Sequence, residues 1–183
     1  MPPPFSRTHR NLGVVIDSKL TWKSHILGIV QRVHAVMYRL RLFCRSTTQA
    51  LRKHLIETLV FPILDYCSLV LAGLSGELSA IRDRLLNYGV TFVFGLRLDE
   101  HVTAYRVRLG WMKGEERRKY FLGCLTYSSR PTRGDVMPLM IPRRYTVTLD
   151  RSSHVTASYY WNSLSPSLRN LPSFHSFKTA LKT

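Results

Sequence analysis

The pattern of apolar and polar positions divides the chain into a short β-rich start and a long helical remainder. Residues 12–16 (LGVVI) are rich in β-branched side chains and precede a turn-forming DSK sequence, which predicts a short strand. Residues 20–22 alternate in polarity, so a second short strand or an extended segment is expected there. Residues 1–11 include three consecutive prolines and are predicted to lack regular structure.

Residues 23–43 show the spacing of three and four that places apolar side chains on one face of an α-helix. Arg32 and Arg39 lie off that face, seven positions apart and therefore at nearly the same angle. Arg41 and Arg45 are four positions apart and are predicted to form a second basic line. The apolar face comprises Ile26, Ile29, Val30, Val33, Met37 and Leu40.

A second helix is predicted to begin at residues 46–49 (STTQ), which have the form of a capping box. Pro62 is expected to end or kink this helix, because proline lacks the amide donor and clashes with the preceding turn. Residues 63–71 are expected to continue as a buried helix that Gly73 closes. The apolar face of the second helix carries Leu51, Leu55 and Leu59.

Capping residues bound the next two predicted helices. Ser75 is a candidate N-cap and Gly95 a candidate C-terminal stop for one long helix. A short helix over residues 102–108 is expected to end at Gly110. The apolar stripe of the longer helix comprises Leu78, Ile81, Leu85, Tyr88 and Phe92.

The last third of the sequence mixes helical and loop signals. Residues 114–127 predict another helix, whereas residues 128–153 contain three prolines and a glycine and predict a loop. Within that loop, residues 145–149 are compatible with a short strand. A short helix over residues 174–181 is expected to close the chain.

The charge is the unusual quantity, because 27 basic residues against 11 acidic ones give +16. Residues 1–50 hold eight basic residues and one acidic residue, and residues 101–150 hold ten basic and four acidic residues. Residues 51–100 hold five basic and six acidic residues, so basic elements surround a near-neutral core. This distribution favours a polyanionic partner. The predicted phosphate-binding residues are Arg32, Arg39, Arg41, Arg45, Arg52, Lys53, Arg106, Arg108, Arg117, Arg118 and Lys119; for each, a solvated surface is the alternative.

Nothing in the sequence has the form of a catalytic or metal site. Nucleotidyl transfer needs converging carboxylates, but the only adjacent acidic pairs are residues 99–100 and 115–116. No phosphate-binding GxxxxGK[ST] loop, GxSxG elbow or HExxH helix is present. The seven histidines are scattered and the three cysteines form no CxxC pair. We therefore assign no catalytic residue, no metal ligand and no cofactor or small-molecule substrate to this chain.

The termini and apolar runs favour an intracellular protein, cytoplasmic or nuclear. The start of the chain lacks the apolar core of a secretion signal. The longest apolar run, residues 59–74, is shorter than the roughly 20 residues that a membrane span needs. It is interpreted as a buried helix, so no membrane partner is predicted.

Four segments together carry a family resemblance. They are RNLGVVIDSKLTWKSHI, LRKHLIETLVFPILDYCSLV, YGVTFVFGLRLDEHVTAYRVRLGWM and the tail SSHVTASYYWNSLSPSLRNLPSFHSFKTAL. The chain resembles non-LTR (LINE-type) retrotransposon reverse transcriptases, RNA-directed DNA polymerases, and is most similar to the jockey-like elements. The resemblance covers nearly all of residues 11–183 and places the chain downstream of the polymerase active site.

The resemblance implies a mainly α fold, namely a thumb-like helical bundle preceded by a short strand or hairpin remnant of the palm. Residues 1–22 would form the proline-rich start and palm edge, residues 23–127 the thumb-like domain, and residues 128–183 a loop-rich basic tail. The catalytic aspartates and their Mg²⁺ belong to the absent palm. The chain would then be a truncated fragment, not an enzyme by itself, that binds template–primer RNA and DNA.

Two alternatives remain open at this point. The aromatic residues Trp111, Trp161 and Tyr160 can stack on bases or pack in the core. The chain can also be a relic, or a protein-interaction module that self-associates through the face left uncovered by the missing palm.

Overall fold

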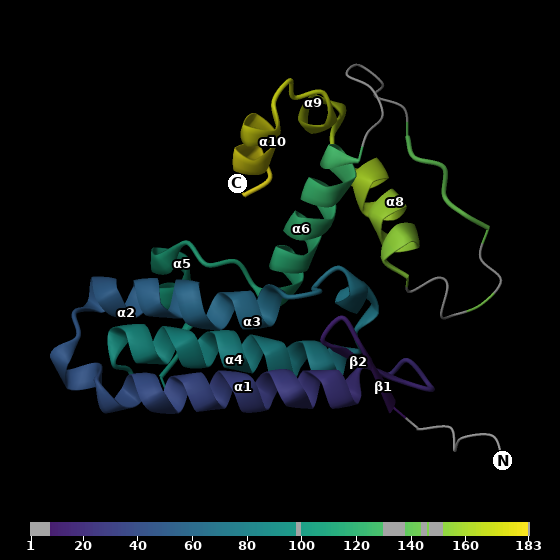
Figure 1. The fold of residues 1–183 in the computed structure, drawn as a ribbon. Coiled ribbons are helices and arrows are strands. Elements are labelled where there is room, and N and C mark those ends of the chain that lie inside the picture. Colours follow the sequence, from purple (N-terminus) through teal and green to yellow (C-terminus); the bar gives the residue numbers. More distant parts are fainter. Residues whose placement is uncertain (1–7, 98–99, 130–137, 144–145, 147–151, 183) are drawn as a thin grey trace, which may run out of the picture. The chain divides into compact units, whose positions relative to one another are not determined.

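The computed structural model describes residues 8–97, 100–129, 138–143, 146 and 152–182. Over these residues the chain is mainly helical, with a short hairpin near its start (Figure 1). The mainly α fold class with a preceding hairpin is therefore confirmed. The chain forms two compact units, Met1–Cys67 with Leu74–Gly114 and Ser68–Gly73 with Glu115–Thr183.

The hairpin differs from the predicted one in its pairing. Strand β1 (Thr8–Asn11) pairs antiparallel with β2 (Val14–Asp17), so the partner strand lies before residues 12–16. The prediction that residues 1–11 lack regular structure is wrong over Thr8–Asn11. Leu12 and Gly13 form the turn with φ of 45° and 79°, the left-handed geometry that a two-residue hairpin requires.

Residues 20–22 form no second strand; they follow a turn at residues 18–19 and lead into the first helix. The Asp17 carboxylate accepts hydrogen bonds from the backbone amides of Lys19, Thr21 and Trp22. Leu20 and Trp22 adopt φ of 52° and 63°, which an extended strand excludes. The Asp17 side chain thus folds the chain back immediately before the first helix.

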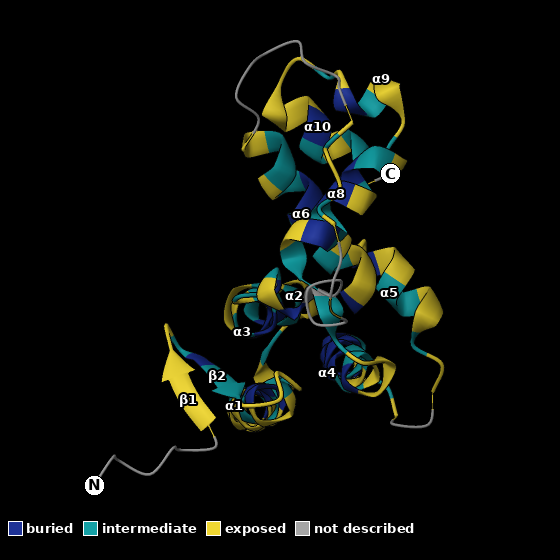
Figure 2. Ribbon diagram, turned by 90° about the vertical axis from the view of Figure 1, so that its right-hand side faces the viewer, coloured by how far each residue is buried: buried dark blue, intermediate teal, exposed yellow. Residues whose placement is uncertain are grey.

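Helices α1 (Lys23–Leu42) and α4 (Gly76–Phe94) contact each other in the first unit, and their buried residues are dark blue in Figure 2. Ile26, Ile29, Val33 and Met37 are fully buried, which confirms the predicted apolar face of α1. Burial of four such side chains stabilises the pair by about 1.5–3 kcal/mol each.

The capping predictions for α4 and α5 (Thr103–Leu109) are confirmed. Ser75 accepts a hydrogen bond from the Leu78 amide at the start of α4. Gly95 and Gly110 end the two helices with φ of 68° and 70°, a conformation that costs glycine little.

Between α1 and α4 the chain stays helical through Pro62. Helix α2 (Gln49–Leu55) continues into a π-helical segment, Ile56–Val60, and then into α3 (Phe61–Asp65). Pro62 lies in the first turn of α3, where its missing amide is tolerated.

Two local predictions around this helical run are wrong. The N-cap of α2 is Thr48, whose hydroxyl accepts from the Leu51 amide, and not Ser46. The buried helix does not reach residue 71, because Cys67 adopts φ of 54° after the last helical turn. A 3₁₀ segment, Val70–Gly73, follows instead.

The second unit is more helical than its sequence suggested. It contains most of α6 (Gly114–Ser128), α8 (Ser153–Ser163), α9 (Pro166–Arg169) and α10 (Phe174–Ala180). Helices α6 and α10 were predicted, whereas α8 and α9 were not. The predicted strand at residues 145–149 lies outside the described residues except for Thr146, which is a bend. The core of this unit includes Leu122, Val155, Trp161 and Phe177.

Candidate nucleic-acid interface

Helix α1 and the residues that follow it present the predicted arginines to solvent. Arg32, Arg39, Arg41 and Arg45 are all exposed. From residue 18 to residue 56 the sequence contains no Asp or Glu. No carboxylate of this stretch therefore competes with a phosphate for these four arginines.

The two predicted basic lines on α1 differ in the structure. Arg32 and Arg39 share one flank of the helix, as expected. Helix α1 ends at Leu42, and Arg45 lies in the following 3₁₀ turn, Cys44–Ser46, so it does not continue a line from Arg41 on one helix.

Arg41 lies against the neighbouring helix. Its guanidinium carbon lies 4.4 Å from the ring centroid of Tyr88 on α4, a cation–π geometry. His34, two turns earlier on α1, stacks on the same ring at 5.6 Å. Tyr88 therefore holds Arg41 at the α1–α4 contact, while its charge stays exposed.

Arg52 has a structural role that the sequence did not reveal. Its Nη2 donates to the carbonyl of Cys44 at 2.7 Å, and its Nε donates to Thr47 Oγ1 at 3.2 Å. These bonds tie the first residues of α2 to the preceding turn. Because two of its donors are used, Arg52 is a weaker phosphate ligand than the exposed arginines of α1.

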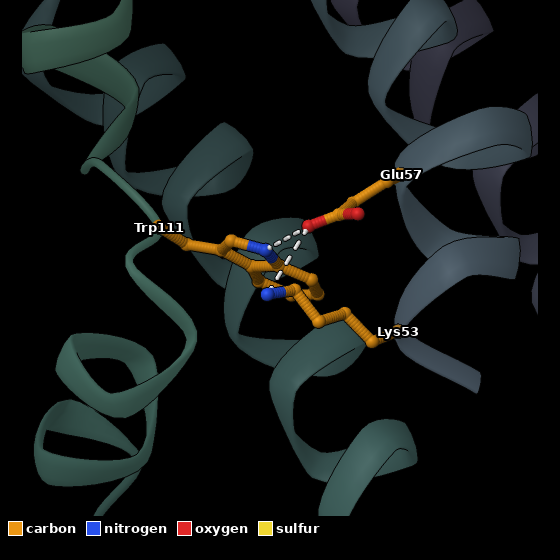
Figure 3. Close-up of polar contacts among 3 residues, drawn as sticks. All are labelled: Lys53, Glu57 and Trp111. Carbon is orange, nitrogen blue, oxygen red and sulfur yellow. Dashed lines mark hydrogen bonds and ion pairs between the residues drawn. The ribbon is translucent and has the colours of Figure 1, made fainter. Parts of the chain in front are cut away.

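Lys53 belongs to a polar contact with Glu57 and Trp111 (Figure 3). Its Nζ lies 3.9 Å from Glu57 Oε1, and the same oxygen accepts a hydrogen bond from the indole Nε1 of Trp111 at 2.9 Å. The adjacent carboxylate offsets the charge of Lys53, so this lysine contributes little net positive potential.

Arg106 and Arg108 lie on α5 with different surroundings. Arg106 is half-buried, and its Nη1 donates to Asn87 Oδ1 at 3.4 Å. Arg108 is exposed, with its guanidinium 5.7 Å from the Phe94 ring centroid. Of the two, Arg108 is the more accessible to a phosphate.

The basic cluster on α6 belongs to the second unit. Lys119 forms an ion pair of 2.8 Å with Glu115, one turn earlier on an exposed surface. The guanidinium of Arg117 lies 5.9 Å from the Phe121 ring, and Arg118 is half-buried. A surface ion pair of this kind contributes about 0–1 kcal/mol, and it partly neutralises Lys119.

Two of the three aromatic residues considered for base stacking are core residues. Trp111 is 8% exposed and packs edge-to-face on Phe61, with 4.8 Å between ring centroids. Trp161 is 1% exposed in the second unit. Tyr160 is half-buried, and burial raises the pKa of its hydroxyl. The core alternative therefore holds for Trp111 and Trp161.

Two other aromatic side chains are exposed beside the arginines of α1. Tyr38 is 69% exposed and Phe43 is 65% exposed. The sequence contained a signal for Tyr38, because it lies outside the apolar stripe of α1. The sequence contained no such signal of exposure for Phe43, since this residue directly follows the last helical residue and belongs to no helical stripe.

His25 links the hairpin to the helices in the first unit. Its Nδ1 accepts a hydrogen bond from the Val15 amide at 3.4 Å, and its side chain is buried. Burial is the main cause that lowers the pKa of His25, and the positive charges of Arg32 and Arg82 lower it further. These surroundings favour the neutral form of His25.

The described residues show neither a metal-binding cluster nor a membrane-spanning helix. Those residues contain no group of three or more His, Cys, Asp or Glu side chains able to hold a metal ion. No helix in the described part of the chain has the length and apolar character needed to cross a membrane.

The second unit contains an apolar pocket of about 330 Å³ between α6, α8 and the residues near Leu139. Its lining includes Leu122, Leu125 and Ala157, with His154 and Ser153 as polar members. It lies next to residues that the structure does not describe, so we assign no ligand to it. Compared with known proteins, the chain matches no protein-family model, no curated protein and no solved structure.

Proposed function

We propose that this chain binds the phosphate backbone of nucleic acid, as the region downstream of the palm in a non-LTR retrotransposon reverse transcriptase. The partner would be template–primer RNA and DNA, and the site of action the cytoplasm or nucleus. The family assignment rests on the sequence resemblance alone. The observation that supports the binding role is the carboxylate-free basic surface of α1.

This surface suits phosphate binding because its positive charge is uncompensated and accessible. Helix α1 itself holds one Lys, three Arg and no acidic residue. Arg32, Arg39 and Arg45 are exposed on or just after α1. Guanidinium groups bind phosphate with charge-assisted hydrogen bonds and release condensed counterions from the strand.

No catalytic step is proposed for this chain. In the resembled family, the palm aspartates hold Mg²⁺ for nucleotidyl transfer, and we assign none of these residues to that ion. The proposed contribution of this chain is to bind the template–primer nucleic acid for a catalytic centre formed elsewhere.

The test is the salt dependence of binding to a short labelled single strand, measured by fluorescence anisotropy. The slope of log K against log salt changes by roughly 0.7 for each phosphate contact on a single strand. We expect the double variant R39Q/R45Q to reduce the slope by about 1.4. The control R10Q/R84Q removes the same charge from exposed residues of β1 and α4.

Equal losses in the two double variants would show a diffuse charge effect and contradict a site on α1. Absence of binding by the unaltered chain at low salt would contradict the nucleic-acid role altogether. In that case the protein-interaction alternative would remain.

A further inference from the structure

The C-terminal end of α1 carries basic side chains between aromatic and aliphatic ones around the helix. Successive residues of an α-helix are turned by about 100°. From this rotation, the order around the axis is Arg41, Tyr38, Leu42, Arg39 and then Phe43. Arg39 therefore lies between the two aromatic positions, and Leu42 adjoins Tyr38.

The apolar members of this cluster are far more exposed than a core position allows. Leu42 is 66% exposed, close to the values of Tyr38 and Phe43. Arg39 is exposed among them, and Arg45 follows two residues after Phe43. The helical rotation puts the two rings roughly 140° apart around the axis, with Arg39 between them, so a ligand must be flexible to reach both rings and both guanidinium groups.

A single strand fits this surface better than a duplex. Every base has a π-face, and aromatic side chains bind that face without regard to sequence. In a duplex these faces are covered by neighbouring base pairs, so the rings would meet only groove edges. In a single strand a base can leave its neighbours while its phosphate reaches a nearby arginine.

The same arrangement disfavours an amphipathic protein helix as the ligand. Such a partner needs a continuous apolar strip with charges at its margins. Here Arg39 interrupts the strip between Leu42 and Phe43. A second copy of the chain is also disfavoured, because each copy carries a charge of +16.

We propose that the end of α1 is a stacking platform for single-stranded nucleic acid. Bases stack on Tyr38 and Phe43, and the flanking phosphates bind Arg39 and Arg45. This inference rests on the proposed nucleic-acid function and specifies the strand form that the same site takes.

The experiment compares three labelled ligands on the full chain at low salt. They are an oligothymidine, an abasic strand with the same number of phosphates, and a duplex of the same length. We expect the oligothymidine to bind at least about tenfold more tightly than the abasic strand, given the usual strength of base–aromatic stacking. We also expect it to bind more tightly than the duplex.

Variants at the two rings isolate stacking from general apolar contact. The double variant Y38L/F43L keeps apolar side chains but removes both rings, and leucine is a strong helix former. It should lose about tenfold or more in affinity for oligothymidine and retain the affinity for the abasic strand. The single variant Y38F keeps the ring and should bind like the unaltered chain.

Each contrary result has a distinct meaning. If the unaltered chain binds none of the three ligands, the proposed function itself fails. If it binds oligothymidine and the abasic strand equally, the platform is wrong but backbone binding stands. Unchanged oligothymidine binding by Y38L/F43L, or a preference for the duplex, also overturns the platform alone. The comparison of ligands on the unaltered chain needs no variant, so a folding defect in Y38L/F43L leaves it valid.

Discussion

The indole Nε1 of Trp111 donates a hydrogen bond of 2.9 Å to Glu57 Oε1, although the two residues lie 54 positions apart. The bond joins the second residue after α5 to the π-helical segment Ile56–Val60. It places Trp111 in the core and leaves Glu57 beside Lys53. Lys53, a predicted phosphate ligand, and Trp111, for which base stacking was one of two alternatives, thus meet at Glu57 in a contact that supports the fold.

Replacing Trp111 separates the two parts of this contact. W111F keeps an aromatic ring but loses the donor, so we expect the free energy of unfolding to fall by about 1 kcal/mol. W111A also loses the packing on Phe61, and the expected loss is about 3–5 kcal/mol. Urea unfolding measures both. The affinity of W111F for a single strand at fixed salt should not change, and a reduced affinity would indicate that Trp111 contacts nucleic acid.

Two glycines within helices predict opposite effects of the same substitution. A Cβ at Gly28 of α1 meets no atom within 4 Å, so G28A should raise the free energy of unfolding by about 0.5–1 kcal/mol. A Cβ at Gly123 of α6 would lie 2.9 Å from Leu181 Cδ2 and 3.1 Å from Tyr160 Cε1. We therefore expect G123A to lower the free energy of unfolding by about 1–3 kcal/mol. Equal shifts in urea midpoint would show that close packing at Gly123 is unimportant.

Burial of His25 predicts lower stability in acid. Its folded-state pKa lies below the ordinary value of 6.5, so the unfolded chain binds the proton more readily. The stabilising contribution is complete above pH 6.5 and is lost as pH falls from there through the lowered pKa. Urea midpoints measured over this window should fall with pH in the unaltered chain.

The variant H25Q provides the control for that pH dependence. Glutamine can still accept from the Val15 amide but does not titrate. We expect the slope of stability against pH below 6.5 to become shallower in H25Q. An identical slope in the two proteins would assign the acid sensitivity to other groups.

Local chemistry explains which parts of the fold could be predicted. The Ser75 cap, the Gly95 and Gly110 stops and the buried stripe of α1 depend on neighbours within a few positions, and all were found. Helix α8 was missed because its sequence, SHVTASYYWNS, is rich in residues that favour strands and loops. It is stabilised instead by burial of Val155, Ser158 and Trp161 at helical spacing.

By itself, the sequence determined the helical class, the principal caps and the position of the carboxylate-free basic stretch. Only the tertiary structure decided which candidates remain accessible. A tryptophan suits either a core or a base-binding surface, and Trp111 is buried because Phe61 and Glu57 reach it from a distant helix. Arg52 is similarly engaged by Cys44 and Thr47. Tyr38 and Phe43 stay exposed because no described element covers the end of α1 where they lie.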